Sequence, residues 1–484
     1  MTSGINPGRV DVKFGVSGPI DGPSAGGILT VGVLAALLGA PIRGDMTMTG
    51  TISPDGSIGP VGGIDLKLQA AADQGYRTVL LPIANMNVRT RETDQVESAA
   101  EVGRRLGLEV IPVGNVQQAF TKFTDGKFAY PAAPAFVLPG NVQELTATQT
   151  TTLLALLRDQ AGKVAAGETN TQIMSLLTIA EDAANNGDNA LAYGVGMLAL
   201  NMANREVASA TAQSTLASAG LAGATTWLRD WTAKAAARNS ALLEASARAA
   251  ATLGYEQQLT LPNALSWLTY NDAILQSVQQ RLDAGPLAAS DVDRFARVLA
   301  DVDVAIETCF PDQLAIVRAA PAKASPGASV VASYLSDYRT FLVRAGQAQQ
   351  DYVQQVIMRG QDPVEFAKQN DIGLLLPTVL NLSNTVADIP PGLDSLPDEV
   401  VEVTTAITYY IATTSLISSL QDFGISEFGI GAEPTQSAQT EVMNTSVATA
   451  AKAVDEVSAL LGQRGLDASL PVWAASYGRA ASDA

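Results

Sequence analysis

The sequence predicts a multidomain protein in which a mixed α/β (α+β) domain is followed by a large all-α domain. Segments with strand-like alternation are interleaved with helical segments as far as residue 124, and strand patterns almost vanish after residue 140. Between them, YPAAPAFVLPG at 130–140 holds three prolines and is typical of a linker. We therefore predict an α/β domain over 1–127, a Pro-rich linker over 128–140 and a helical domain over 141–484.

The first domain is predicted element by element. Residues 9–16 (RVDVKFGV) alternate between apolar and polar and predict a strand with one buried face. The apolar run that follows, AGGILTVGVLAALL at 25–38, is too long for a strand and predicts a buried helix ending at Gly39. Residues 45–53 alternate again, and Pro54-Asp55-Gly56 is a turn signal. Further on, the patterns predict helices over 63–75 and 116–123 and strands over 77–82 and 109–113.

Beyond the linker, the long Ala/Leu/Gln-rich stretches predict about ten helices. DAANNGD at 182–188 joins two of them, but no fixed 34-residue period indicates a repeat array. Two uncharged runs, Gly22–Ile42 and Val403–Leu420, are interpreted as buried helices, because the first is broken by Gly and Pro and the second is rich in Thr and Ser. No signal-peptide pattern opens the sequence, so no compartment is assigned.

Composition excludes several classes of site and partner. The chain has no histidine and a single cysteine, Cys309, which argues against a disulfide framework and against the usual zinc, copper and iron sites; no cofactor or metal is predicted. Residues 1–130 carry a net charge of −1, and the remaining 354 residues carry −17 of the total of −18. An acidic chain without a basic stripe is not expected to bind nucleic acid. The acidic surface is interpreted as a solvated one, and the alternative is an acidic docking face.

Ser24 is the first candidate for chemistry. Residues 22–26 (GPSAG) fit the nucleophile-elbow pattern G-x-S-x-G, but the hydrolase triad that uses this pattern needs a histidine, which the chain lacks. At the start of an apolar helix, free backbone N–H groups favour a developing negative oxygen. The alternative is that Ser24 is only an N-cap, which would stabilise the helix by about 1 kcal/mol.

Lys67 is the candidate base. On the helix predicted over 63–75 it shares the apolar side, while a polar ladder occupies the other side. The apolar side holds Ile64, Leu68 and Ala71, and the ladder holds Asp65, Gln69 and Asp73. A lysine that acts as a base near neutral pH must lose about 3 pKa units, and burial acts in that direction. The alternative is a lysine that extends along the helix edge to water.

Four motifs stand in order along the first domain. They are DGPSAG at 21–26, PIRGDMTMTG at 41–50, GPVGGIDLKLQAA at 59–71 and GYRTVLLPIAN at 75–85. This pattern resembles the proteolytic domain of Lon-type ATP-dependent proteases, which use a Ser-Lys dyad. The resemblance implies that Ser24 is the nucleophile, that Lys67 is the general base and acid, and that Thr49 orients the lysine. It also implies polypeptide substrates and assembly into rings, which the helical domain could block.

The sequence departs from this family in two respects. No G-x-x-x-x-G-K-S/T motif is present, since Gly126-Lys127 is followed by Phe and Gly162-Lys163 by Val. The family domain also has several strands before the serine, whereas 23 residues precede Ser24, so we expect a longer natural protein or a trimmed fold. The function expected is an ATP-independent Lon-like serine endopeptidase for unfolded or flexible polypeptides. The alternatives are a helical scaffold with a degenerate peptidase domain and a module that cleaves its own chain. We expect the helical domain to bind substrate or to mediate oligomerisation.

Overall fold

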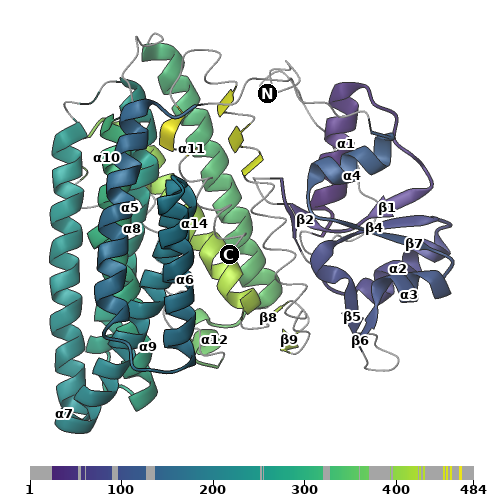
Figure 1. Ribbon diagram of the computed structural model, residues 1–484. Coiled ribbons are helices and arrows are strands. Elements are labelled where there is room, and N and C mark those ends of the chain that lie inside the picture. Colours follow the sequence, from purple (N-terminus) through teal and green to yellow (C-terminus); the bar gives the residue numbers. More distant parts are fainter. Residues whose placement is uncertain are drawn as a thin grey trace. The chain divides into compact units, whose positions relative to one another are not determined.

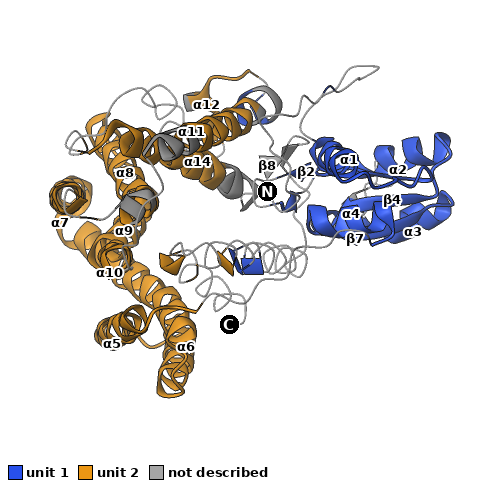
Figure 2. Ribbon diagram, turned by 90° about the horizontal axis from the view of Figure 1, so that it is seen from above, with its two compact units in different colours: residues 1–135, 352–359, 420–457 blue, residues 136–351, 360–419, 458–484 orange. Residues whose placement is uncertain are grey.

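The structure of the chain is a computed structural model. It describes residues 24–52, 56–59, 61–89, 96–126, 137–250, 255–319, 328–358, 360–369 and 396–422, with Lys13, Leu253, Leu393 and short pieces between 425 and 472. The chain divides into two compact units, one of residues 1–135, 352–359 and 420–457, the other of residues 136–351, 360–419 and 458–484 (Figure 2). The strand predicted over 9–16, apart from Lys13, and most of the linker predicted over 128–140 lie outside the described residues.

A three-stranded parallel sheet forms the centre of the first unit (Figure 1). Its middle strand, β4 (Thr78–Pro82), pairs with β1 (Met46–Met48) on one side and with β7 (Glu109–Val113) on the other. All five residues of β4 are buried, as expected for the middle strand of a parallel sheet whose two faces are covered. The strands predicted over 77–82 and 109–113 are thus confirmed.

Helices cover both faces of this sheet (Figure 1). They are α1 (Gly26–Leu38) and α4 (Val116–Thr124) on one face, and α2 (Ile64–Asp73) and α3 (Ala99–Arg105) on the other. Successive side chains of β4 serve the two layers in turn: Leu80 packs in the core with α1 and α4, and Val79 and Leu81 pack in the core with α2 and α3. The unit is therefore an α/β/α sandwich with a core on each side of the sheet.

The helix α1 is less buried than its sequence predicts. Its existence and its end at Gly39 are confirmed. However, its buried residues are Gly27, Val31 and Ala35, which are spaced by four and form one stripe toward the sheet. The other side chains are half-buried or exposed, because α1 is an outer layer and one side of a surface helix faces away from the sheet.

Short elements complete the unit. They are the hairpin β2 (Thr51–Ile52) and β3 (Ile58–Gly59), the hairpin β5 (Asn87–Arg89) and β6 (Val96–Ser98), and the 3-10 turn η2 (Ile83–Asn85). The strand predicted over 45–53 is divided in two at Gly50. Gly50 has φ 154°, and a Cβ there would lie 2.5 Å from Cγ2 of Ile58. The chain therefore leaves the parallel sheet and turns into a hairpin at this residue.

The second unit is helical, as predicted. Its helices are α5 (Gly140–Ala161), α6 (Glu168–Asn185), α7 (Asn189–Ala250), α8 (Tyr255–Asp283), α9 (Ala289–Val304), the π-helical turn η3 (Ala305–Cys309), α10 (Phe310–Ala319), α11 (Ala328–Asp351), α12 (Pro363–Gln369) and α14 (Asp398–Asp422). The long α7 changes direction at Gly220 and packs against α5, α6, α8 and α9. The later segments of the first unit contain the π-helical turn η4 (Tyr352–Ile357) and the hairpin β8 (Ile425–Ser426) and β9 (Gly429–Ile430).

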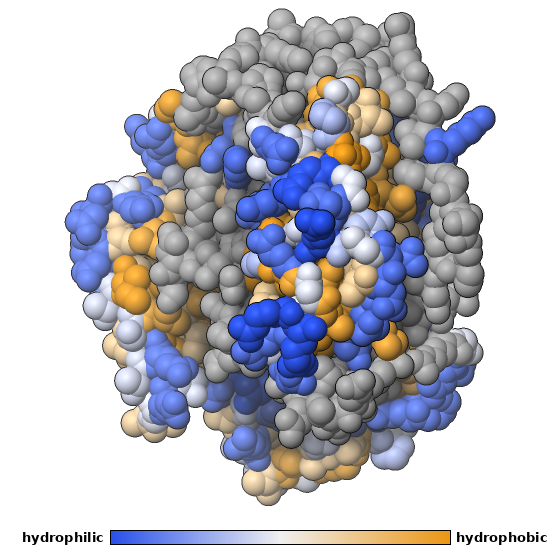
Figure 3. All heavy atoms as spheres, turned by 90° about the vertical axis from the view of Figure 1, so that its right-hand side faces the viewer, coloured by the Kyte–Doolittle hydropathy of each residue, from blue (hydrophilic) through white to orange (hydrophobic). Residues whose placement is uncertain are grey.

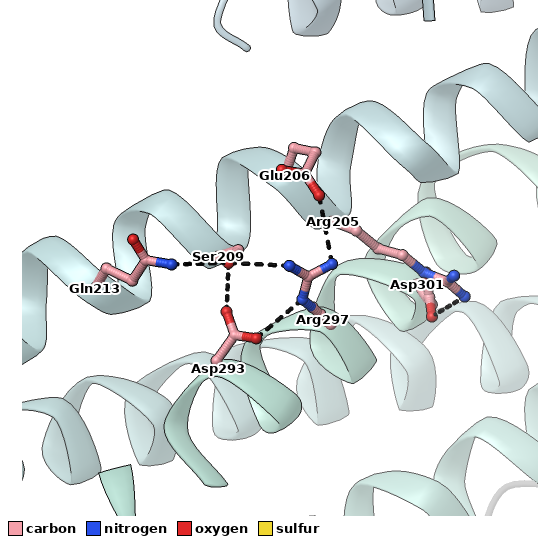
Figure 4. A network of polar contacts seen from close by, with 7 residues as sticks. All are labelled: Arg205, Glu206, Ser209, Gln213, Asp293, Arg297 and Asp301. Atoms are coloured by element: carbon pink, nitrogen blue, oxygen red, sulfur yellow. Dashed lines mark hydrogen bonds and ion pairs between the residues drawn. The ribbon is translucent and has the colours of Figure 1, made fainter. Parts of the chain in front are cut away.

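Charged and polar side chains join α7 to α9 (Figure 4). Arg205 binds Asp301 through two guanidinium nitrogens, at 2.7 and 2.8 Å. Arg297 binds Asp293 on its own helix at 3.0 Å and the buried hydroxyl of Ser209 on α7 at 3.1 Å, and that hydroxyl also donates to Asp293. Partly exposed ion pairs each contribute about 1 kcal/mol or less. The network therefore sets the register of the two helices more than it stabilises them.

None of the described helices has the combination of length and hydrophobicity that crossing a membrane requires. The run Val403–Leu420 lies within α14, where Val403, Ala406 and Ile407 pack in a core with residues of α11. On the side of the molecule seen in Figure 3, hydrophobic side chains are interspersed with hydrophilic ones. In the first unit the exposed large hydrophobic side chains include Leu38, Ile42 and Leu66, and scattered exposure of this kind is ordinary.

Candidate active site

The segment that carries Ser24 is held against the end of strand β1. The backbone carbonyl of Ser24 accepts a hydrogen bond from the Gly50 N–H at 2.9 Å and another from the Thr49 hydroxyl at 3.1 Å. One turn later the Gly27 N–H donates to the Gly50 carbonyl at 3.0 Å. These three bonds place the start of α1 at the carboxyl end of a parallel strand, the edge at which open α/β sheets carry their sites.

This close approach requires a glycine at position 27. A Cβ on Gly27 would lie 2.7 Å from Cε of Met48 and 3.3 Å from the Gly50 carbonyl oxygen. The methionine end could move, but the backbone oxygen is the acceptor of the Gly27 N–H and cannot move without breaking that bond. The glycine that follows the DGPSAG motif therefore allows the helix to begin directly beside β1.

The hydroxyl of Ser24 does not cap the helix. α1 begins after Ala25, and within the described part of the chain the Ser24 hydroxyl makes no hydrogen bond. The side chain is half-buried, and it precedes the first turn of the helix, where the N–H groups have no intrahelical partners. The N-cap alternative considered from the sequence is therefore not what the structure shows.

Lys67 lies in the first turns of α2, which begins after Gly63. Its side chain is half-buried on the helix that buries Ile64 and Leu68, and its Nζ donates a hydrogen bond of 2.7 Å to the carbonyl of Gly62. The amine therefore turns back toward the loop before its helix. Among the described residues, Lys67 makes no hydrogen bond to Ser24 or to Thr49. Ser24 is therefore bonded to Thr49 but not directly to Lys67.

Asn85 was not predicted as a site residue, although it ends the GYRTVLLPIAN motif. It lies in η2, directly after β4, and its side-chain amide makes two hydrogen bonds to the backbone of Val61. Oδ1 accepts from the Val61 N–H at 2.9 Å, and Nδ2 donates to the Val61 carbonyl at 2.8 Å. Its only signal in the sequence was its position in the motif, because the two residues lie 24 apart in the chain.

Residues 10–123 match the model of the Lon protease (S16) C-terminal proteolytic domain. The N-terminal part of the chain is a Lon-type proteolytic domain. The match contains β1 to β7 and α1 to α3 in full, and the positions of Ser24, Thr49 and Lys67 fall inside it. The α/β fold predicted for this region from its strand and helix patterns is confirmed by the structure.

Curated Lon proteases are similar to this chain over stretches of 67 to 125 residues. Lon protease 2 of Bacillus subtilis is 36% identical over 101 residues, which is 20% of this chain and 18% of that protein. Lon protease 2 of Sorangium cellulosum is 52% identical over 67 residues, 14% and 8% of the two chains. The Lon protease of Escherichia coli K12 is 34% identical over 125 residues, 24% and 15%. The similarity thus spans less than a fifth of the length of each of these relatives.

Proposed function

We propose that the chain is an ATP-independent Lon-like serine endopeptidase that cleaves peptide bonds in unfolded or flexible polypeptides. Ser24 is the nucleophile and Lys67 is the general base and acid. The observation that carries the proposal is the Lon-type match over residues 10–123, together with a Ser24 that is tied by its backbone to the end of β1. Thr49 supports the site through its bond to the Ser24 carbonyl, and the orientation of Lys67 is a further role proposed for it.

The chain has no histidine, and the base proposed in its place is the lysine that the resemblance to Lon-type domains implies. A neutral Lys67 amine takes the proton of the Ser24 hydroxyl while Oγ bonds to the carbonyl carbon of the peptide. The tetrahedral oxyanion then collapses, the C–N bond breaks, and the lysine ammonium returns its proton to the leaving amine. Lys67 next takes a proton from water, whose oxygen attacks the ester carbon, and the proton returns to Ser24 as the acid product leaves.

The oxyanion needs backbone donors at the start of α1. The Gly27 N–H is engaged by the Gly50 carbonyl, so it is not available to the substrate. The amides of Ala25 and Gly26 have no hydrogen bond with another described residue and lie next to Ser24 in the chain. We assign the oxyanion to these two amides, whose position at a helix N-terminus favours negative charge.

The test is hydrolysis of a fluorogenic peptide pool by the full chain without ATP. Ser24→Ala and Lys67→Ala should each lower kcat/KM by at least about a thousandfold, as loss of a nucleophile or its base does. Matched controls are Ser214→Ala and Lys122→Ala, which change an exposed serine and an exposed lysine elsewhere and should leave turnover unchanged. Equal turnover in the parent and in Ser24→Ala would refute the proposal.

A second reading, a scaffold with a degenerate peptidase domain, is favoured by one observation: no hydrogen bond between described residues links Ser24 directly to Lys67. Unliganded active sites often have catalytic contacts that tighten only when substrate binds. The same assay separates the readings. Repeated turnover supports the endopeptidase, one self-cleavage without turnover indicates a self-processing module, and no reaction in the parent indicates a scaffold.

A further inference from the structure

The side chain of Asn85 holds the loop before α2 in the way that a neighbouring strand would. One amide group pairs with both the N–H and the C=O of Val61, at 2.9 and 2.8 Å. Both backbone groups of one residue are therefore fixed by one side chain, which sets the orientation of the peptide planes on either side of Val61. The side chain of Val61 is itself buried in the core with α2 and α3, so the residue is restrained from two directions.

Asn85 is attached to a rigid part of the fold, the central strand β4. Asn85 is three residues beyond Pro82, the last residue of β4, which is buried along its whole length and paired on both sides. The turn η2 between them is closed by a bond from the Met86 N–H to the Ile83 carbonyl. The Asn85 side chain therefore links the loop that leads into α2 to the end of the central strand β4.

The next residue of that loop receives the amine of Lys67. Gly62 directly follows Val61, whose carbonyl and N–H Asn85 holds, and the Gly62 carbonyl accepts from Lys67 Nζ at 2.7 Å. Gly63 then precedes the helix, and the Lys67 N–H bonds to the Gly63 carbonyl at 3.0 Å. A shift of the loop would thus move the acceptor of the amine relative to the backbone of the same lysine.

We infer that Asn85 is a positioning residue that fixes the Lys67 amine through the Val61–Gly62 backbone. The inference rests on the proposed function for its effect on catalysis, because Lys67 is the base of that reaction. Asn85 makes no contact with the substrate in this account. It acts through the loop, so its loss should lower the rate of the chemical step and leave substrate binding nearly unchanged.

The experiment compares Asn85→Ala with Asn87→Ala, an exposed asparagine two residues along the chain. Asn85→Ala should lower kcat by about tenfold or more with KM within about twofold, since small misplacements of a reacting group are costly. Asn87→Ala should match the parent. Asn85→Asp can still accept from the Val61 N–H but, when ionised, sets a second acceptor oxygen against the Val61 carbonyl, so it should lower kcat as Asn85→Ala does. It also serves as the second variant should Asn85→Ala fail to fold, which thermal unfolding would show.

A second readout does not depend on turnover. Reductive methylation followed by peptide mapping gives the reaction rate of the Lys67 amine relative to the exposed Lys122 and Lys163 in the same sample. In Asn85→Ala this relative rate should rise about fivefold, the factor that one ordinary hydrogen bond gives. An unchanged relative rate would overturn the inference even if kcat fell, because the residue would then be structural only. A parent that does not turn over peptides would refute the proposed function, while the methylation rate would still decide the role of Asn85.

Discussion

Thr49 supports the nucleophile through backbone contact. Its hydroxyl donates to the Ser24 carbonyl at 3.1 Å, and the side chain is 9% exposed, so water does not readily replace it. Thr49→Val keeps the shape and removes the donor. We expect kcat/KM for peptide hydrolysis to fall about fivefold to tenfold, as for the loss of one hydrogen bond, and Thr49→Ser to retain activity. A Thr49→Val variant as active as the parent would show that the bond does not matter for catalysis.

Asp312 gives the helical unit a pH dependence. Tyr193 donates a hydrogen bond to the carboxylate of Asp312. Burial raises the pKa of Asp312 from 3.8 to about 7, although a hydrogen bond with Gln149 acts to lower it. Because the folded pKa is the higher one, the native state binds the proton more tightly. The contribution of this carboxyl to stability is therefore largest below about pH 4 and is lost as the pH rises toward 7.

The measurement is thermal unfolding of the parent and Asp312→Asn from pH 4 to 8. Tryptophan fluorescence reports the helical unit, since Trp227, Trp231 and Trp267 lie in it. The parent should lose Tm relative to Asp312→Asn as the pH rises through this window, and an exposed control, Asp182→Asn, should stay parallel to the parent. A difference between the parent and Asp312→Asn that does not change with pH would contradict the account.

At the scale of elements, the start of α1 depends on Gly27. Gly27→Ala would bring a methyl group within 3.3 Å of the Gly50 carbonyl oxygen, so the helix must shift away from β1. Gly32, on the same helix, has open space within 4 Å of the position that a methyl group would take, and Gly32→Ala should instead stabilise the helix by up to about 1 kcal/mol.

Hydrogen exchange of peptides covering 26–38 checks this pair in the full chain. Gly27→Ala should speed exchange there, consistent with a cost of about 1–3 kcal/mol for overpacking, and should lower peptidase activity. Gly32→Ala should slow exchange or leave it unchanged. Slower exchange in both variants would show that helix propensity, and not the contact with β1, dominates at this site.

Some elements of the first unit could be predicted from sequence patterns and others could not. β4 and β7 were predicted within a residue. β4 is a fully buried apolar run with clear ends, and β7, whose residues are mostly half-buried or exposed, is a short Val- and Ile-containing run between Gly107 and Gly114. The break between β1 and β2 was not predicted, since the alternation continues through Gly50 and only the sheet pairing reveals it. The segment 86–105 carries many charges and no clear periodicity, so β5, β6 and α3 gave no signal.

The residues of the candidate site could be predicted from the sequence, but their contacts could not. Motif order identified Ser24, Thr49 and Lys67 as candidates, but not the contacts between them. The bond from Thr49 to the Ser24 carbonyl joins residues 25 apart, and the bonds of Asn85 join residues 24 apart. Such contacts depend on which strand ends meet at one edge of the sheet, and a single sequence does not specify that.

At the scale of the whole molecule, the chain has no G-x-x-x-x-G-K-S/T motif of the kind that binds ATP. We expect hydrolysis of a permanently unfolded protein such as casein at the same rate with and without ATP and Mg²⁺. A stable folded protein should resist cleavage until it is denatured, because its peptide bonds reach an active site only after local unfolding. ATP-stimulated degradation of a folded substrate by the purified chain would contradict this expectation.

In the proposed mechanism Lys67 activates Ser24, and site mapping of a fluorophosphonate label tests this activation directly. Mass spectrometry of the labelled chain should find the adduct on Ser24 and not on Ser17, the other serine of the tryptic peptide 14–43. Labelling should slow by about a hundredfold or more in Lys67→Ala and stay unchanged in Lys122→Ala. An adduct on another residue, or equally fast labelling of Ser24 in Lys67→Ala, would contradict the account.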